Sequence, residues 1–241
     1  MMLSEHSRLV QKFDTCRTAF MLCDVQEKVE PHISNFHDAV HVANAMAAIH
    51  EILGPERSVF AVTEQYPRGV GHVHPAIRLP ADAIIAEKVQ SSMLVPTLRP
   101  HILGDAERGI APVQQVFLWG HETHGCVLQT ADELLTHGIR VAILVDGCAA
   151  QLPEMHDVAV LQMAHWDGLM LTTTISAVMQ LTRSDPRHVK SVLNTLKQFV
   201  SDSEATREPA ATVAHGDATA TFDSRPAVAL DAPSAWCGMD H

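Results

Sequence analysis

The chain has 241 residues, of which 46% are hydrophobic and 19% charged, and its formal net charge is −11. This length and composition are typical of a globular protein with one α/β domain or two small ones. The negative charge argues against a nucleic-acid-binding protein, which would carry a basic face. No apolar run approaches the roughly 18 residues of a membrane span, and the first residues lack the apolar segment of a secretory signal. We therefore expect neither a nucleic-acid partner nor a membrane partner.

Apolar runs alternate with helical patterns through most of the chain. Such alternation predicts right-handed βαβ units and an α/β fold, a doubly wound six-stranded parallel sheet with helices on both faces. Expected strands are residues 17–23, 58–63, 83–86, 116–119, 140–145 and 168–173. Expected helices are residues 36–53, 126–137, 153–165, 175–181 and 186–200, with a short helix inside 93–103.

The ends of the chain differ from this pattern. Residues 1–15 form a predicted N-terminal extension, and residues 16–200 form the predicted domain. Residues 201–241 hold seven acidic and two basic residues and are rich in Ala, Asp, Ser, Thr and Pro. Such a composition offers little surface for a core, so we expect a disordered acidic tail.

The cysteines indicate the compartment. There are five, with irregular spacing and no C-x-x-C pair, namely Cys16, Cys23, Cys126, Cys148 and Cys237. This pattern predicts neither a disulfide framework nor a zinc ribbon. We expect a reducing compartment, the cytoplasm, with mitochondria as the alternative.

Three chemically active side chains follow three different predicted strands. Asp24, Lys88 and Cys126 each lie at or just past the carboxyl end of a strand, and these ends converge on one edge of a parallel sheet. Cys126 also begins a predicted helix, whose N-terminal dipole favours a thiolate. Asp24 would take the thiol proton, Lys88 would stabilise the thiolate, and Cys126 would attack an electrophilic carbon.

The segments around these residues resemble the isochorismatase-like cysteine hydrolases, and most closely the isochorismatase domain-containing proteins. The resemblance rests on Leu22-x-Asp24-x-Gln26, Thr63-Glu64-Gln65-Tyr66-Pro67, Glu87-Lys88-x-x-x-Ser92-Met93, Gly120-x-Glu122-Thr123-His124-x-Cys126 and the later strand ends at Asp146 and Thr172-Thr173-Thr174. These motifs occur in order, on the expected elements, over about residues 18–200.

The resemblance implies an Asp24–Lys88–Cys126 triad and a cis peptide bond between His121 and Glu122. It also implies an oxyanion hole made by the backbone N–H groups of Glu122 and Cys126. The implied reaction is hydrolysis through a covalent thioester, with no cofactor. The candidate substrate-pocket residues lie in the same motifs and are Gln26, Gln65, Tyr66, His121, Thr123 and His124.

The sequence departs from some relatives in two places. Nicotinamidases of this family place an Asp-x-His motif near a metal, whereas this loop reads Glu64-Gln65-Tyr66. Neither His72-x-His74 nor His121-x-x-His124 completes a known ligand geometry, so we expect no metal site. The second departure is Gly125, where the family commonly has a branched apolar residue; glycine there loosens the start of the helix.

The sequence therefore predicts a cysteine hydrolase that acts on a small amide, ester or related bond and forms a homo-oligomer. Cleavage of isochorismate itself fits less well, because hydrolysis of a vinyl ether needs an acid rather than a thiol nucleophile. One alternative is a binding or scaffold protein with an idle triad, in which Cys126 would titrate near ~8.5. Another is a redox-sensing thiol, which would respond to peroxide without turnover.

Overall fold

The structure is a computed structural model that describes residues 10–206. Six parallel strands form one sheet in the order β3-β2-β1-β4-β5-β6, which confirms the predicted fold class. The strands are β1 (Thr18–Cys23), β2 (Ser58–Gln65), β3 (Ile84–Lys88), β4 (Gln115–His121), β5 (Arg140–Ala149) and β6 (Leu169–Thr172). The helices are α1 (Phe36–Leu53), α2 (Pro67–Val70), α3 (Arg99–Leu103), α4 (Leu128–Thr136), α5 (Pro153–Met163), α6 (Thr174–Thr182) and α7 (Val189–Thr206), with short turns η1 (Glu30–His32) and η2 (Thr123–Val127).

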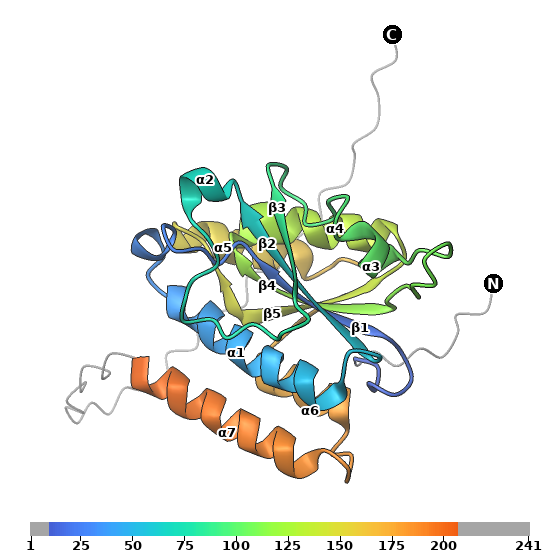
Figure 1. The fold of residues 1–241 in the computed structure, drawn as a ribbon. Coiled ribbons are helices and arrows are strands. Elements are labelled where there is room, and N and C mark those ends of the chain that lie inside the picture. The colour runs from blue at the N-terminus through green and yellow to red at the C-terminus, as the bar shows by residue number, and fades with distance from the viewer. Residues whose placement is uncertain (1–9, 207–241) are drawn as a thin grey trace, which may run out of the picture. The chain divides into compact units, whose positions relative to one another are not determined.

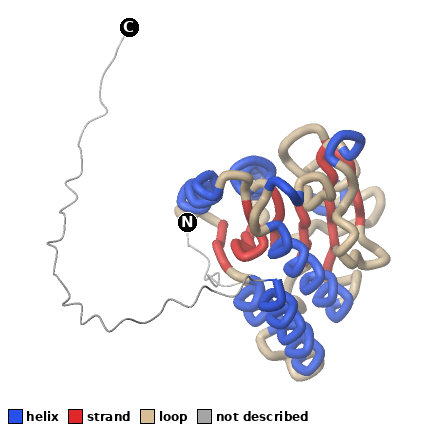
Figure 2. Tube along the Cα trace, turned by 90° about the vertical axis from the view of Figure 1, so that its left-hand side faces the viewer, coloured by secondary structure: helices blue, strands red, loops and turns tan. Residues whose placement is uncertain are grey.

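Helices cover both faces of the sheet. Figure 1 shows α1, α6 and α7 on one side and α3, α4 and α5 on the other, and Figure 2 shows the strands between these layers. The strand order reverses between β1 and β4, which are neighbours in the sheet but far apart in the chain. In open α/β sheets, ligands bind outside the carboxyl ends of the strands at such a point.

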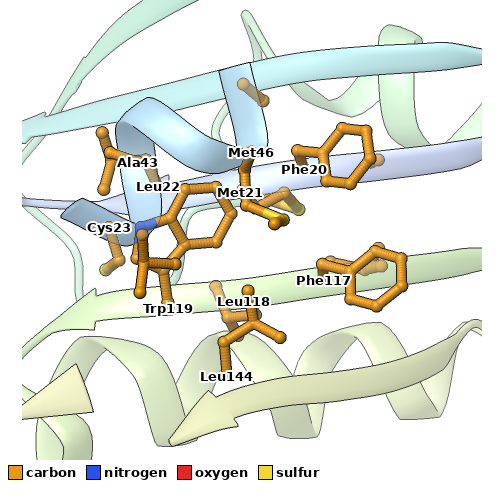
Figure 3. Close-up of a cluster of buried hydrophobic side chains, with 14 of the residues drawn as sticks. Phe20, Met21, Leu22, Cys23, Ala43, Met46, Phe117, Leu118, Trp119 and Leu144 are labelled. Carbon is orange, nitrogen blue, oxygen red and sulfur yellow. The ribbon is translucent and has the colours of Figure 1, made fainter. Parts of the chain in front are cut away.

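The core lies where β1 and β4 meet α1. The rings of Phe20 and Phe117 stack across the two strands with centroids 5.5 Å apart, and both are buried (Figure 3). Trp119 and Met46 extend this cluster toward the carboxyl ends of the strands. Because the cluster fills the centre of the sheet, it holds the strand ends that carry the chemistry in fixed positions.

The expected boundaries needed several changes. Helix α1 matches its predicted range, but β4 and β5 both continue beyond their apolar runs, with a register shift between Leu118 and Gly120. The expected helix at residues 126–137 begins instead as the π-helical turn η2, and α4 follows it. The loop after β2 contains the short helix α2.

The described ends also differ from the expected division. Val10 and Phe13 are buried in the core, and the Phe13 N–H donates to the Leu181 carbonyl, so part of the predicted extension packs on the domain. Helix α7 continues to Thr206, into the segment assigned to the tail. The remainder of both segments lies outside the described residues. Within residues 10–206, no helix is both long enough and apolar enough to cross a membrane.

Helix α5 exposes more apolar surface than its sequence pattern suggested. Ala159 and Met163 are buried, but Val158 and Leu161 are 62% and 69% exposed. A helix that is apolar on several sides is usually covered on more than one of them.

Candidate active site

The structure brings the three chemically active side chains together. Asp24 directly follows β1, Lys88 ends β3, and Cys126 lies in the turn η2 after β4. The Lys88 Nζ atom is 2.7 Å from Asp24 Oδ2 and 3.2 Å from Cys126 Sγ. Asp24 and Lys88 are buried and Cys126 is half-buried. One ammonium group therefore contacts a carboxylate and a thiol at the carboxyl edge of the sheet.

A close approach between β1 and β4 allows this arrangement. Gly120 pairs with Cys23 in the sheet and has a φ of 121°, and a Cβ at this position would collide with the Cys23 carbonyl oxygen. Glycine is thus required both by the backbone conformation and by the neighbouring strand. The cis peptide bond between His121 and Glu122 follows, as the resemblance implied.

The turn η2 is fixed by hydrogen bonds at its start. The Glu122 carbonyl accepts from the N–H groups of Gly125 (3.1 Å) and Val127 (3.3 Å). The Glu122 carboxylate accepts from the Gln151 N–H at 2.7 Å. These contacts fix the backbone of the turn and therefore the direction in which the Cys126 side chain projects from it. The oxyanion hole assigned to the N–H groups of Glu122 and Cys126 stays a prediction.

Further hydrogen bonds orient Asp24 and Lys88. The Thr63 hydroxyl donates to Asp24 Oδ1 at 2.8 Å, and Lys88 also donates to Gln65 Oε1 at 2.6 Å and to the Gln90 carbonyl at 3.1 Å. Lys88 thus has four acceptors for its three hydrogens. A fully engaged lysine is held in one place rather than free to follow a ligand.

Thr130 connects the lysine segment to the nucleophile turn. Its hydroxyl donates to the Cys126 carbonyl at 2.6 Å and accepts from the Met93 N–H at 3.0 Å. Thr130 was not among the predicted site residues.

Cys23 is a second residue whose place at the site was not predicted from the sequence. Its sulfur is fully buried, 3.5 Å from Asp24 Oδ2, and the ligand atoms of Cys23, Asp24 and Cys126 all lie within 4.8 Å of one another. Strand alternation points residues 23 and 24 to opposite faces, but Asp24 has a left-handed φ of 51°, which ends the alternation. The signal available in the sequence was a cysteine directly before the candidate base.

The electrostatics of the site favour a thiolate at Cys126. Its pKa is lowered, first by hydrogen bonding from the Cys23 thiol and then by Lys88, against the opposing effects of burial and of Asp24. Burial acts to lower the pKa of Lys88, but the electrostatic interactions with the nearby sulfurs and with the Asp24 carboxylate, together with the hydrogen bond to Asp24, outweigh this effect and raise that pKa. Burial raises the pKa of Cys23 well above its ordinary value. Cys126 is therefore the thiol of this pair that ionises.

Two of the predicted pocket residues brace the loop after β2. The Gln26 amide donates to the carbonyls of Gln65 and Gly71 and accepts from the Gln65 N–H at 2.7 Å, so both of its ends are engaged. Gln65 in turn holds Lys88. Tyr66 is 55% exposed and has a left-handed φ of 39° beside this loop.

The three candidates around the nucleophile turn have different surroundings. His121 is buried against Phe36, with ring centroids 5.0 Å apart, and burial lowers its pKa to about 3. The Thr123 hydroxyl contacts the Ala149 carbonyl and His156 Nδ1, at 3.0 and 2.8 Å. His124 is exposed, 4.0 Å from the Glu122 carboxylate. Contact of these residues with a substrate stays a prediction.

The histidines of the His72-x-His74 pair, which was considered as a metal-ligand pair, have carboxylate partners instead. His72 lies 3.1 Å from Glu64, and His74 lies 3.3 Å from Glu30. Within residues 10–206, the one group with metal-ligand spacing is Cys23, Asp24 and Cys126. Because the Lys88 ammonium contacts both Asp24 and Cys126, a metal ion there would have to displace it.

One cavity lies away from these residues. It has a volume of about 640 Å³, and its lining includes Gln115, Arg140 and Leu169, which begin β4, β5 and β6. The amino and carboxyl ends of parallel strands are opposite edges of a sheet. This cavity is therefore separate from the Asp24–Lys88–Cys126 cluster.

Comparison with known proteins agrees with this architecture. Residues 18–176 match the family model of the isochorismatase domain. The mouse isochorismatase domain-containing protein 2A is 34% identical over 184 residues, which cover 76% of this chain and 84% of that protein. A hypothetical protein from Trypanosoma cruzi is 42% identical with a TM-score of 0.75, over 80% of this chain and 97% of that chain. A structure described as MAR1 ribonuclease from Caenorhabditis elegans is 29% identical with a TM-score of 0.67, over 78% and 92% of the two chains.

Proposed function

Because the chain belongs to the isochorismatase family, we propose that it is a cysteine-dependent hydrolase of a small amide, ester or related C–N or C–O bond. The observation that carries this proposal is the buried Lys88 ammonium, which contacts both the Asp24 carboxylate and the Cys126 sulfur. A nucleophilic cysteine needs a base, a lowered pKa and an open face. Asp24, Lys88 and the half-exposed Cys126 supply these three requirements.

The proposed reaction has two stages. Asp24 takes the Cys126 proton, and the thiolate attacks the substrate carbonyl carbon. The N–H groups of Glu122 and Cys126 stabilise the negative oxygen that forms. The tetrahedral intermediate then expels an amine or alcohol, which receives the proton held by Asp24. Water, deprotonated by Asp24, attacks the resulting thioester and releases the acid and the free thiol.

The net charge of the chain supports a small substrate rather than a nucleic acid. The net charge of −11 opposes binding of a polyanion. A ribonuclease activity, which the name of the Caenorhabditis elegans relative states for that protein, would need a basic face for the RNA backbone.

Homo-oligomer formation is part of the proposal, supported by the exposed apolar side chains of α5. A reducing compartment is also part of it, supported by the free thiols of Cys16, Cys23, Cys126 and Cys148.

The test is the pH dependence of Cys126 alkylation in the full chain, read by mass spectrometry at each cysteine. The midpoint should lie well below ~8.5 in the wild type and rise in Lys88→Ala. Asp24→Asn should also shift the profile, because the carboxylate and the thiol titrate together. Lys28→Ala, which removes an exposed lysine, is the matched control and should leave the midpoint in place. A low midpoint should be accompanied by turnover in a screen of small amides and esters.

Two results would favour the alternatives. A Cys126 midpoint near ~8.5 that ignores both triad substitutions would leave a binding or scaffold protein with an idle triad. A low midpoint without turnover of any amide or ester would leave a thiol that serves only redox chemistry.

A further inference from the structure

A second thiol lies behind the candidate nucleophile. Cys23 ends β1 with its side chain fully buried. Its sulfur is within 4.8 Å of Cys126 Sγ and 3.5 Å from Asp24 Oδ2. The hydrolytic mechanism needs one sulfur, so the position of the second one calls for a separate explanation.

The two thiols differ in their access to solvent. Cys126 is half-exposed, and its thiolate is stabilised by Lys88 at 3.2 Å. Cys23 is fully buried. An oxidant that arrives from solution therefore meets Cys126 first, and the thiolate is the form that reacts. The nearest reductant for an oxidised Cys126 is then Cys23.

We propose that Cys23 is a resolving thiol, which converts peroxide-oxidised Cys126 into an intramolecular Cys23–Cys126 disulfide. The inference rests on the proposed function in one respect, namely that Cys126 is the reactive thiol. The disulfide removes the nucleophile and stops hydrolysis. It also protects Cys126 from oxidation to sulfinic acid, which thiol reductants do not reverse.

The chemistry uses groups that are in place, together with hydrogen peroxide as the oxidant. The Cys126 thiolate attacks one peroxide oxygen, the O–O bond breaks, and Cys126 becomes a sulfenic acid. The departing hydroxide takes up the proton that the Cys126 thiol had released and becomes water. Asp24 Oδ2 takes the proton of the Cys23 thiol, and the Cys23 sulfur attacks the Cys126 sulfur. The S–O bond breaks, and the departing hydroxyl group takes up the proton from Asp24 as water. In sum, two thiols and one peroxide give one disulfide and two waters.

The formation of a disulfide requires the two sulfurs to move closer together. A disulfide has an S–S distance of about 2 Å, and the sulfurs of Cys23 and Cys126 lie within 4.8 Å of each other. Gly125 directly precedes Cys126, and a glycine restricts the backbone dihedral angles less than any other residue. The turn at Cys126 can therefore adjust more readily than strand β1, which carries Cys23.

The experiment treats the reduced full-length protein with hydrogen peroxide, blocks free thiols with N-ethylmaleimide, and maps the peptides by mass spectrometry. The wild type should give a peptide pair linked through Cys23 and Cys126, and dithiothreitol should restore the Cys126 thiol. Cys23→Ser keeps a polar donor but lacks the sulfur, so Cys126 should proceed to the sulfinic acid. The fraction of Cys126 recovered by dithiothreitol should then fall by roughly tenfold. Cys148→Ser, which changes another buried cysteine, is the matched control and should behave as the wild type.

Two outcomes would overturn the inference. One is the same yield of Cys126 sulfinic acid in the wild type and in Cys23→Ser. The other is a disulfide that links Cys126 to any other cysteine. Product ratios are compared rather than rates, because Cys23 also affects the ionisation of Cys126. The alkylation profile of the same samples separates the two proposals: a low Cys126 midpoint without a Cys23–Cys126 disulfide rejects the resolving thiol and leaves the hydrolase.

Discussion

Cys126 and Cys148 lie near each other in the fold, at the carboxyl ends of neighbouring strands, but in different surroundings. Cys148 is in β5, where it pairs with Gly120 of β4, and Cys126 is in the turn that follows β4. Burial raises the pKa of Cys148 to about 12. The pKa of Cys126 is lowered, with the Cys23 thiol and Lys88 as the causes. The same edge of the sheet thus holds one thiol with a raised pKa and one thiol with a lowered pKa.

The difference between the two sites is the presence of partners, not the position along a strand. Lys88 reaches Cys126 from β3, which β2 and β1 separate from β4, and Asp24 after β1 holds the Lys88 ammonium at 2.7 Å. The pKa of Cys148 is instead set by burial, by the Gly120 backbone and by the charge of Asp146. An active thiol in this fold therefore depends on long-range contacts that three separate segments of the chain provide.

The largest expected effect is on turnover. Cys126→Ala should reduce kcat by about 10³-fold or more for a substrate found in the amide and ester screen, because the nucleophile is lost. Cys148→Ala should leave kcat within about twofold and cost about 1 kcal/mol in the free energy of unfolding, as for other small truncations of buried side chains. Steady-state kinetics and urea denaturation of both variants provide the test. Equal losses of kcat would show that the two thiols do not differ in function.

A smaller effect is expected on stability from the buried ion pair. Lys88→Met should leave the Asp24 carboxylate buried with no cation beside it, and the free energy of unfolding should fall by about 3–5 kcal/mol at neutral pH. The double variant Asp24→Asn/Lys88→Met removes both charges, so its loss should be smaller than the sum of the two single losses. Urea denaturation of the four proteins gives the coupling. Additive losses would mean that Lys88 does not stabilise the Asp24 charge.

Much of this arrangement could be predicted from local sequence patterns. The range of α1 followed from its apolar spacing and the Gly54-Pro55 stop, and the meeting of Asp24, Lys88 and Cys126 followed from the convergence of parallel strand ends. These inferences depend on the spacing of apolar residues and on the alternation of strands and helices, and both can be read directly from the sequence. They needed no knowledge of side-chain packing.

The rest depended on contacts that a single sequence does not reveal. The left-handed conformation of Asp24 brings Cys23 into the site, and no local pattern specifies it. Gln26 stays a predicted pocket residue, and the hydrogen bonds of its amide to a carbonyl and an N–H of Gln65 could not be predicted from the sequence. The outward positions of Val158 and Leu161 on α5 depend on which side of that helix the sheet covers.

His121 extends the comparison to a second buried group whose pKa is shifted chiefly by burial. Like Cys148 it is buried, and within residues 10–206 neither ring nitrogen has a hydrogen-bond partner. Burial lowers its pKa to about 3, whereas an unfolded chain would hold it near ~6.5. Between these values the unfolded state binds the proton and the folded state does not. The contribution of the neutral, buried His121 to the free energy of unfolding is therefore fully present above pH ~6.5. It is lost as the pH falls, by up to about 1.4 kcal/mol for each pH unit.

The smallest expected effect is thus on the pH dependence of the free energy of unfolding. The free energy of unfolding, measured in urea from pH 7 to pH 5, should fall more steeply in the wild type than in His121→Phe, which fills the same space beside Phe36 without a titrating group. His124→Ala, which changes an exposed histidine in the same turn, is the control and should keep the wild-type slope. Equal slopes for the wild type and His121→Phe would mean that His121 is charged in the folded protein. The edge of the sheet would then stabilise a cation at a second place besides Lys88, and the contrast with Cys148 would be limited to thiols.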